Sequence, residues 1–482
     1  MEIRVRFAPS PTGFLHIGGL RTALYNWLFA KNCGGACILR IEDTDRSRYV
    51  ENAQENLVNS LKWAGIEFDE SPVSGGNYSP YIQSERLGIY TEYAKKLLES
   101  GWAYYAFDTT EELAAKRELQ QKEGSDFKYD RAGGRNSFTL STYEVKKLFD
   151  ENIPKVLRLK VPSDEFINFK DIIRGDISVP SKDIDDQVLL KSDGFPTYHL
   201  ANVVDDHLMK ISHVIRGEEW LPSTPKHILL YDAFGWEKPQ FAHLPLLLNP
   251  DKSKLSKRQG SVAVEDFIEK GFLKEAIVNF VSLLGWNPGA DREIYTIDEL
   301  IENFNLEKVN KGGAVFDVKK LEWMNAQYIK SLPENDLAKR LIPYIKKSGF
   351  ELPCIEYLED VIKLTRERVT FLHEIPQNFN YLFEEPAEYE QSYYEKYWKQ
   401  NTVDLIKPLL ELYNAEDDFS HEKLHDLTKN YCEQSGIKLK EIIHPLRLMI
   451  TGKSTGAGMF ETMAVIGREY CIPRIEKFLA RL

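Results

Sequence analysis

The sequence is poor in cysteine and has no long apolar run. Five cysteines in 482 residues are too few for a disulfide framework, and a reducing compartment suits them best. No stretch approaches about 18 consecutive apolar residues, so we expect no membrane-spanning helix. The first residues show no basic region followed by an apolar segment, so we expect no secretory signal. These absences favour a cytoplasmic protein without a membrane partner.

The sequence also lacks an excess of positive charge, because its formal net charge is -12 at pH 7. Such a balance repels polyanions and excludes a protein whose whole surface binds nucleic acid. An RNA partner would need a restricted basic footprint. Apolar residues, in contrast, are ample: 43% of the chain is hydrophobic, and its length predicts three or more domains.

The stretch FAPSPTGFLHIGG, residues 7–19, joins a short strand to a helix. The strand, 3–7, alternates apolar and basic residues, and the helix carries one apolar stripe. Two glycines at the start of the helix let a ligand approach the backbone closely. Exposed amides and the positive end of the helix dipole favour an anion there. The alternative is a structural turn in which His16 is already hydrogen-bonded.

A second loop, 249–260, carries four cations within the seven positions from Lys252 to Arg258. Such a cluster alone is typical of a solvated surface. Together with the first loop it predicts nucleotidyl transfer at an α-phosphate, since both loops could stabilise charge on phosphoryl oxygens. His16 and Lys257 would act as donors. No nucleophilic side chain is required, because a substrate carboxylate can attack directly.

Strands and helices alternate through the first part of the chain, which is typical of a parallel sheet. A strand at 3–7 leads into a helix, and a second apolar strand, 36–41, ends in acidic residues. Ligands bind such sheets at the carboxyl ends of the strands. Ser10, His16 and Glu42 all fall at those ends.

The sheet is predicted to resume further along the chain. Strand character returns at Val203–Val204, at Val214–Ile215 and at 243–248, with a helix at 225–234. The segment 82–199 has a different character, and we interpret it as an insertion between two halves of the sheet domain.

Helical periodicity dominates beyond residue 330, for example at 358–372 and 437–450. We expect one or two all-helical domains there. No internal repeat or low-complexity tract is apparent.

Two signatures in these loops resemble those of class I aminoacyl-tRNA synthetases. Pro9–Gly19 resembles the first signature, and Lys254–Arg258, with the sequence KLSKR, resembles the second. The first signature usually ends in histidine, and a final glycine such as Gly19 is found in the bacterial glutamyl branch. Further blocks resemble glutamyl-tRNA synthetases over essentially the full length: 40–45, 83–86, 193–206, 216–220, 249–252, 323–325 and 444–447.

The resemblance implies a multidomain fold with an α/β Rossmann-like parallel-sheet catalytic domain, split by an α/β insertion. A stem-contact region and all-α C-terminal anticodon-binding domains would follow. The expected parts are the two halves of the catalytic domain, 1–81 and 200–248, the inserted acceptor-end-binding domain, 82–199, the stem-contact domain with the lysine loop, 249–330, and two helical anticodon-binding domains, 331–390 and 391–482.

The resemblance also implies ATP-dependent attachment of L-glutamate to tRNA(Glu) through glutamyl-adenylate, with release of AMP and pyrophosphate. In relatives glutamate activation needs bound tRNA, and we carry this over as a hypothesis. A monomer is expected. Mg²⁺ is expected with ATP through phosphates and water, without a protein ligand. Zinc-containing members have a Cys-x-Cys pair where this chain has Ala106-Phe107-Asp108, so we expect no structural zinc and no other metal site.

The resemblance assigns catalysis to His16, Lys254 and Lys257. The residues that it implies for ATP are Pro9, His16, Gly18, Gly19, Glu219, Lys254, Ser256 and Lys257.

Glutamate has two carboxylates and one ammonium group, so its site needs forked cations and an anion. The residues that the resemblance implies are Arg6, Ala8, Ser10, Glu42, Tyr198, Asn202 and Arg216. Arg6 and Arg216, with Tyr198, would bind the side-chain carboxylate, and Ser10 and Glu42 the ammonium. Glutamine would leave a guanidinium underpaired, so Arg216 is the leading specificity residue. From the residues alone, a structural Arg6–Glu42 ion pair and ordinary strand-end roles for Tyr198 and Asn202 are the alternatives.

Arg366 and Arg368 lie where discriminating members have an arginine that reads the anticodon, and a solvated helix face is the alternative. Other functions also remain open. A nondiscriminating enzyme would glutamylate tRNA(Gln) as well. A truncated paralogue that modifies tRNA(Asp) is disfavoured by the long helical region. A small-molecule nucleotidylyltransferase would not need that region, and an inactive paralogue is disfavoured by the intact His16, Lys254 and Lys257.

Overall fold

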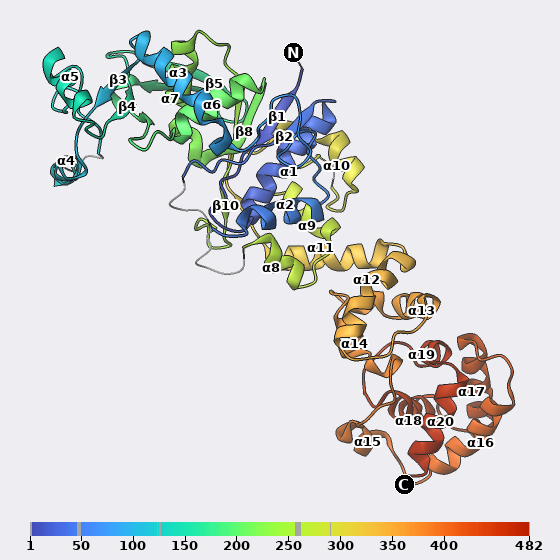
Figure 1. Ribbon diagram of the computed structural model, residues 1–482. Helices are drawn as coiled ribbons and strands as arrows, with labels where there is room; N and C mark the ends of the chain where they lie inside the picture. The colour runs from blue at the N-terminus through green and yellow to red at the C-terminus, as the bar shows by residue number, and fades with distance from the viewer. Residues whose placement is uncertain are drawn as a thin grey trace. The chain divides into compact units, whose positions relative to one another are not determined.

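The computed structural model (Figure 1) forms two compact units. The first comprises Met1–Lys270 and Ile277–Asp317, and the second comprises Gly271–Ala276 and Val318–Leu482. The first unit mixes strands and helices, and the second is helical. The structure describes residues 2–45, 50–122, 124, 127–255, 262–289 and 291–481.

The N-terminal strand β1 (Arg4–Phe7) pairs in parallel with β2 (Ala36–Leu39), and the helix α1 (Ile17–Asn32) connects them. The apolar stripe of α1 is buried, as the sequence predicted. The alternation of apolar and basic residues in β1 is typical of a strand with one face in solvent, but both faces of β1 are buried. Its two arginines are accommodated by acidic partners, since Arg4 pairs with Glu70 and Arg6 pairs with Asp206.

The predicted insertion, residues 82–199, contains a small antiparallel sheet with strand order β3-β4-β7. Its strands are β3 (Ala103–Ala106), β4 (Val156–Leu159) and β7 (Val188–Leu190). The helices that precede or accompany it are α2 (Ala53–Trp63), η2 (Gln83–Arg86), α3 (Leu87–Glu99), α4 (Thr110–Lys122), α5 (Thr142–Asp150) and η3 (Ser181–Asp183).

A second sheet has the strand order β6-β5-β9-β8. The hairpin of β5 (Phe166–Asp171) and β6 (Gly175–Pro180) lies within residues 82–199, the segment predicted to be an insertion. It nevertheless joins this sheet, because Asp171 pairs in parallel with Phe241 of β9 (Gln240–Leu244). Strand β9 also pairs in parallel with β8 (His213–Gly217), and this register places Arg216 beside His243.

The prediction of a strand at Val203–Val204 was wrong, because both residues lie in the helix α6 (Tyr198–Leu208). This helix is buried along much of its length, so a short apolar run within it resembles a buried strand. Tyr198 and Asn202 are consequently helical and not strand-end residues. The helix predicted at 225–234 is confirmed as α7 (Thr224–Phe234), which follows η4 (Glu218–Ser223).

The strand expected at 243–248 is divided into β9 and β10 (Leu247–Leu248). Pro245 lies between them and provides no backbone N–H for a ladder. Strand β10 pairs in parallel with β11 (Ala314–Val315). The remaining elements before the helical unit are α8 (Val264–Glu269), α9 (Lys274–Ser282), α10 (Ile297–Asn303) and η6 (Leu306–Lys308).

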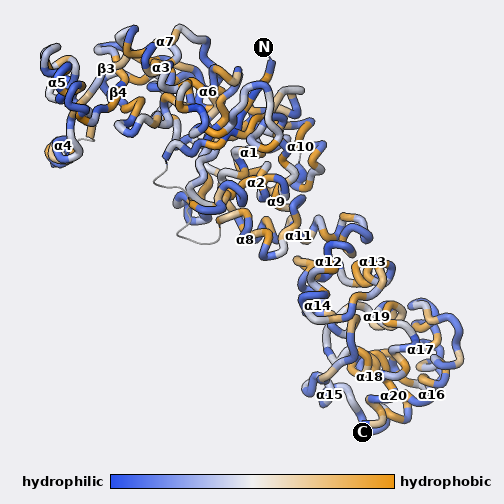
Figure 2. The backbone as a smooth tube through the Cα atoms, in the orientation of Figure 1, coloured by the Kyte–Doolittle hydropathy of each residue, from blue (hydrophilic) through white to orange (hydrophobic). Residues whose placement is uncertain are grey.

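The second unit is built from helices along which apolar and polar residues are interspersed (Figure 2). The helix expected at 358–372 ends earlier than predicted, because Val369 is extended. The helix expected at 437–450 begins later than predicted, at Lys440. The elements are α11 (Val318–Ser331), α12 (Glu334–Lys347), α13 (Ile355–Thr365), η7 (Arg366–Arg368), α14 (Glu374–Asn378), η8 (Asn380–Leu382), α15 (Gln391–Tyr397), α16 (Thr402–Ala415), α17 (His421–Ser435), α18 (Lys440–Thr451), α19 (Met459–Ile466) and α20 (Arg468–Leu479).

Within the part of the chain that the structure describes, every helix is too short or too polar to cross a membrane.

Candidate active site

A pocket of about 450 Å³ opens at the carboxyl ends of β1 and β8. The walls bring together most of the residues that the sequence singled out. They are Arg6, Ala8, Pro9, Ser10, His16, Gly18, Gly19, Glu42, Tyr198, Arg216 and Glu219. Asn202 lies outside the lining but contacts it through Arg6. Lys254 is described but does not line the pocket.

His16 caps the N-terminus of α1, where its Nδ1 accepts a hydrogen bond of 2.9 Å from the Gly18 amide. A neutral imidazole that accepts at Nδ1 carries its proton on Nε2. Gly18 leaves little spare room, because a Cβ at this position would lie 3.3 Å from His16 Nδ1. The start of α1 therefore combines backbone amides, the positive end of the helix dipole and a fixed imidazole, which is a suitable arrangement for phosphate.

Both ends of the lysine loop are held by elements that adjoin the pocket. On one side the amide of Leu255 donates to Leu247 O at 2.9 Å, and Lys254 pairs with Leu248. On the other side the amide of Ile17 donates to Val262 O at 2.9 Å, directly after His16. The first signature is thus joined by a backbone hydrogen bond to Val262, which follows the second signature in the chain. The predicted ATP residues Ser256 and Lys257 lie outside the described residues.

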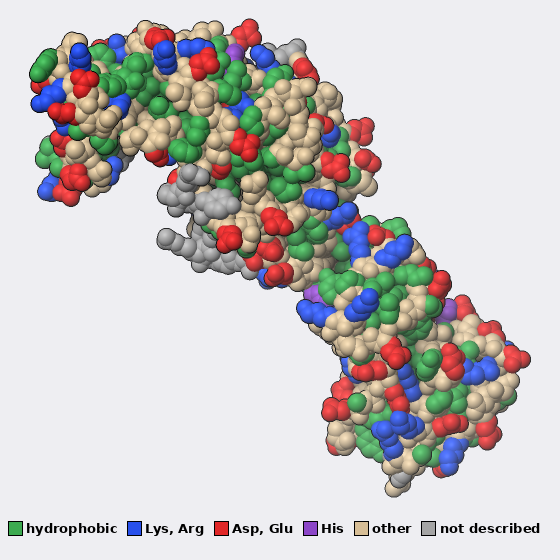
Figure 3. All heavy atoms as spheres, viewed as in Figure 1, with side chains coloured by type: hydrophobic (Ala, Val, Ile, Leu, Met, Phe, Trp, Pro, Cys, Tyr) green, Lys and Arg blue, Asp and Glu red, His purple; other side chains and the backbone are tan. Residues whose placement is uncertain are grey.

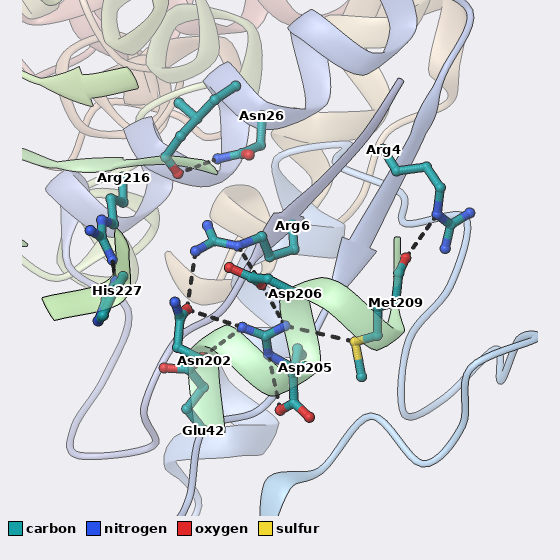
Figure 4. A network of polar contacts seen from close by, with 12 residues as sticks. Arg4, Arg6, Asn26, Glu42, Asn202, Asp205, Asp206, Met209, Arg216 and His227 are labelled. Atoms are coloured by element: carbon teal, nitrogen blue, oxygen red, sulfur yellow. Dashed lines mark hydrogen bonds and ion pairs between the residues drawn. The ribbon is translucent and has the colours of Figure 1, made fainter. Parts of the chain in front are cut away.

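A buried network of charges lies beside the pocket, around Arg6 and Glu42 (Figure 4). Asp206 accepts hydrogen bonds from Arg6 at 3.0 Å and from Arg40 at 2.8 Å. Arg40 also pairs with Glu42 at 3.0 Å. Asn202 Oδ1 lies within 3.2 Å of Arg6 and 3.3 Å of Arg40. Arg6 and Glu42 therefore have separate ion partners, which differs from the direct pair that was the alternative.

The two carboxyl groups of this network respond to burial in different ways. Burial would raise the pKa of Asp206, but Arg6 and Arg40 outweigh it and lower that pKa below its usual value. Burial raises the pKa of Glu42, and Arg40 offsets only part of the increase. Asp206 is thus the fixed counter-ion of the two arginines. Glu42 lines the pocket and would be stabilised in its ionised form by a further cation.

Arg216 has a different environment, because its partners among the described residues are all uncharged. Nε donates to His243 Nε2 at 3.0 Å, and Nη1 donates to Tyr198 Oη at 2.8 Å and lies 3.3 Å from His227 Nδ1. Nη2 donates to Thr224 Oγ1 at 2.9 Å. Arg216 is 5% exposed and has no ion pair with any described carboxylate. An anion that bound beside this buried cation would therefore stabilise it.

The histidines around Arg216 are held in the neutral state. Burial lowers the pKa of His243 to about 4, although Asp171 partly opposes this shift. Burial, followed by the positive charge of Arg216, lowers the pKa of His227 well below its usual value. His199 contacts His227 at 3.1 Å, and burial lowers its pKa to about 3. Neutral imidazoles can accept hydrogen bonds from Arg216 without cancelling its charge.

Four residues behind Arg216 were not predicted from the sequence: Asp171, Thr224, His227 and His243. All four are almost completely buried. A signal was available only for His243, which begins a predicted strand near the strand that carries Arg216. The others come together through the sheet register and the packing of α7, which a single sequence does not reveal.

Among the described residues, no group of three or more His, Cys, Asp or Glu side chains is arranged to bind a metal ion. Asp108 lies where zinc-containing relatives are expected to have a cysteine. It accepts hydrogen bonds from Lys116 at 2.9 Å and from Tyr129 at 2.5 Å. Its carboxylate is thus already occupied by protein donors.

Family comparisons agree with the two units. A family model described as tRNA synthetases class I (E and Q), catalytic domain, matches residues 2–323. A second, described as anticodon binding domain, matches residues 336–479.

Individual relatives match over the full chain. A glutamate–tRNA ligase of Chloroherpeton thalassium is 52% identical and covers 100% of this chain and 98% of its own length. One of Chlorobaculum parvum is 50% identical with the same coverage. A crystal structure of a glutamate tRNA ligase from Elizabethkingia meningosepticum in complex with its amino acid is 42% identical, covers 100% of both chains and has a TM-score of 0.94.

These matches confirm the fold class that the sequence predicted, a parallel-sheet catalytic domain followed by a helical anticodon-binding region. They also agree with the resemblance of the two loops to class I signatures. The chain belongs to the glutamate–tRNA ligase family of class I aminoacyl-tRNA synthetases.

Proposed function

We propose that this chain attaches L-glutamate to tRNA(Glu) in two steps. ATP and glutamate first give glutamyl-adenylate and pyrophosphate, and the glutamyl group then passes to the terminal ribose of the tRNA with release of AMP. One observation carries the proposal: Arg216, a guanidinium without a carboxylate partner among the described residues, shares a pocket with the helix start that His16 caps. The site thus offers one partner for a carboxylate and another for phosphate.

The amino acid would lie on the network side of the pocket. Arg216 and Tyr198 would bind the side-chain carboxylate, with Arg6 beside them. The ammonium group of glutamate would stabilise the ionised form of Glu42, with Ser10 as a further acceptor. The remaining candidates are Ala8, at the pocket wall, and Asn202, which acts through Arg6.

The nucleotide would lie on the helix side of the pocket. An oxygen of the α-carboxylate attacks the α-phosphorus, and the bond from that phosphorus to the bridging oxygen of pyrophosphate breaks. His16 and the amides at the start of α1 would donate to phosphate oxygens, and Lys254 and Lys257 would add positive charge from the loop. The other nucleotide candidates are Pro9, Gly18, Gly19, Glu219 and Ser256.

ATP use follows from the family, and Mg²⁺ would accompany the nucleotide through phosphate oxygens and water. We expect no structural zinc. This expectation is supported by the hydrogen bonds that engage Asp108 and by the absence of thiolates from that stretch of the sequence.

The tRNA would contact several parts of the chain. The segment 82–199 would hold the acceptor end, 249–330 would contact the stem, and the helical domains 331–390 and 391–482 would bind the anticodon. The match of residues 336–479 to an anticodon binding domain supports the last assignment. We further propose a cytoplasmic monomer, which light scattering of the purified protein would test.

A nondiscriminating activity toward tRNA(Gln) has no support in the comparisons, since the relatives described above are named glutamate–tRNA ligases. The full-length match also leaves a small-molecule nucleotidylyltransferase without support.

Charging assays with purified tRNA(Glu) and tRNA(Gln) test the proposal. We expect glutamylation of tRNA(Glu) alone, and comparable charging of tRNA(Gln) would contradict it. A parallel assay follows ATP–pyrophosphate exchange with and without tRNA. Exchange at the full rate without tRNA would reject the hypothesis that activation requires bound tRNA.

A further inference from the structure

Arg216 is held from behind by a chain of three buried side chains. Its Nε donates to His243 Nε2 at 3.0 Å, and His243 Nδ1 lies 2.6 Å from Asp171 Oδ2. Arg216, His243 and Asp171 are 5%, 0% and 1% exposed. They lie on the neighbouring strands β8, β9 and β5, so the parallel sheet itself fixes their spacing.

The hydrogen bonds determine which nitrogen of His243 carries the proton. The Asp171 carboxylate can only accept, so Nδ1 must donate to it. Nε2 of the neutral ring then presents a lone pair toward the Nε–H of Arg216. The ring is neutral at physiological pH because burial lowers its pKa to about 4.

The interposed imidazole has an electrostatic consequence. A carboxylate in direct contact with Arg216 would pair with it and compete with a substrate carboxylate. With His243 between them, Asp171 orients the guanidinium but does not pair with it. Arg6, in contrast, touches the carboxylate of Asp206 directly.

We propose that Asp171 and His243 are positioning residues for glutamate selection, which fix the guanidinium of Arg216 toward the pocket and leave its charge available to the side-chain carboxylate of the substrate. This inference rests on the proposed function. It assigns a role in amino-acid recognition to a carboxylate of the β5–β6 hairpin, which lies within the segment predicted to be an insertion.

The substitution Asp171→Asn tests the relay with little change in shape. The Oδ1 of Asp171 accepts from the amides of Ile173 at 2.9 Å and Arg174 at 2.8 Å, and the amide oxygen of asparagine can keep both bonds. The NH₂ group would then face His243 Nδ1 and force the ring proton onto Nε2, opposite the Nε–H of Arg216. We expect the KM for glutamate to rise about tenfold or more. The KM for ATP and for tRNA should stay within twofold.

Two variants of His243 provide a second, independent test. His243→Gln retains an oxygen that can accept from Arg216, so its KM for glutamate should stay within about threefold of the wild type. His243→Leu removes the acceptor and should raise that KM about tenfold or more. If Asp171→Asn does not fold, this pair decides the question.

Asp69→Asn is the matched control, because Asp69 also accepts a backbone amide of the sheet, that of Cys37 at 2.8 Å, and does not line the pocket. Its kinetic constants should be unchanged. ¹⁵N NMR of labelled histidine gives a direct readout of the proton: Nδ1 of His243 should be protonated in the wild type, and Nε2 in Asp171→Asn.

An unchanged KM for glutamate in both Asp171→Asn and His243→Leu would overturn the inference. Equal losses toward glutamate, ATP and tRNA, together with a lowered melting temperature, would also overturn it and indicate a merely structural role. Neither result would affect the proposed function, which fails only if the wild-type enzyme does not charge tRNA(Glu) with glutamate.

Discussion

Arg6 and Arg216 line the same pocket but differ in their electrostatic surroundings. Arg6 is paired with Asp206, whereas Arg216 contacts neutral groups only among the described residues. A substrate carboxylate near Arg6 must share that cation with Asp206, but it can pair with Arg216 without competition. The difference makes Arg216 the stronger determinant for glutamate over glutamine, whose uncharged amide would leave a buried cation uncompensated.

Replacing Arg216 with lysine should therefore impair glutamate use. A lysine ammonium cannot contact His243, Thr224 and a bidentate carboxylate at once. We expect a loss of about 2–3 kcal/mol, or a fall of roughly 30- to 160-fold in kcat/KM for glutamate in tRNA-dependent pyrophosphate exchange. Arg292→Lys, at an exposed arginine paired with Glu299, is the control and should change nothing. Similar kinetics for the two variants would argue against the role of Arg216.

At the scale of single elements, the helix α1 links the pocket to its scaffold. Its apolar stripe packs in the core of the first unit, and its first turn carries Gly18 against the ring of His16. The position of the imidazole thus depends on a rigid helix and on the lack of a side chain at residue 18.

Gly18→Ala should slow adenylate formation. The added methyl group would lie 3.3 Å from His16 Nδ1 and shift the ring by a few tenths of an ångström. We expect a fall of about tenfold in kcat with an unchanged KM for glutamate. Gly88→Ala in α3 is the matched control, because its Cβ meets no atom within 4 Å. It should keep full activity and stabilise the fold by about 0.5 kcal/mol. A Gly18→Ala enzyme with normal turnover would contradict this view of His16.

The sequence predicted α1 and the parallel pairing of the first strands, because local signals encode them: an apolar stripe and small residues beside a helix start. Most of the pocket lining was predicted from the resemblance to glutamyl-tRNA synthetases, since the residues alone pointed only to Ser10, His16 and Glu42. The sequence did not predict that Val203 belongs to a helix, since a short buried apolar run looks alike in both structures. It also missed His243 and Asp171, whose contact depends on the pairing of β5 with β9 across about 70 residues of chain.

At the scale of the whole molecule, the net charge of -12 restricts where RNA can bind. Figure 3 shows basic and acidic side chains interspersed over the visible face. In the second unit, Arg366 is tied to Glu334 at 2.9 Å, whereas Arg368 is exposed and has no ion pair among the described residues. Of the two anticodon candidates, Arg368 is thus better placed to meet a polyanion.

Arg368→Ala should weaken tRNA(Glu) binding and reduce the slope of log Kd against log salt by about one. Arg366→Ala is the matched control, and its salt dependence should equal that of the wild type because its charge is already paired with Glu334. Filter binding at several salt concentrations measures both. A larger effect for Arg366 would reverse the assignment.

The buried histidines predict acid lability of the first unit. In the unfolded chain they titrate near pH 6.5, whereas folding lowers the pKa to about 4 for His243 and to about 3 for His199. Below pH 6.5 the unfolded chain binds more protons, so the free energy of unfolding falls with pH down to these values and is fully retained above pH 6.5. The loss approaches about 1.4 kcal/mol per pH unit for each histidine.

Urea unfolding between pH 7.5 and pH 5, followed by tryptophan fluorescence, measures this dependence. His199→Gln removes one of the titrating groups. The slope of the free energy of unfolding against pH should therefore correspond to about one proton fewer than in the wild type. The carboxyl of Asp171 has a lowered pKa, so its stabilising effect is lost only as the pH falls below its ordinary value of about 3.9. That loss lies outside this range. An identical decline in the variant would show that His199 is not responsible.

The pairing of β5 with β9 limits how this enzyme can be rearranged by recombination. A chimaera that exchanges residues 82–199 for the corresponding segment of a distant synthetase would also exchange an edge of the catalytic sheet, and with it the carboxylate behind His243. Grafts in that region should respect the hairpin at 166–180 and take their crossover points on either side of it. The segment that is expected to hold the tRNA end therefore contributes a strand to the sheet that carries Arg216. We expect exchanges of this segment to change amino-acid selection as well as tRNA preference.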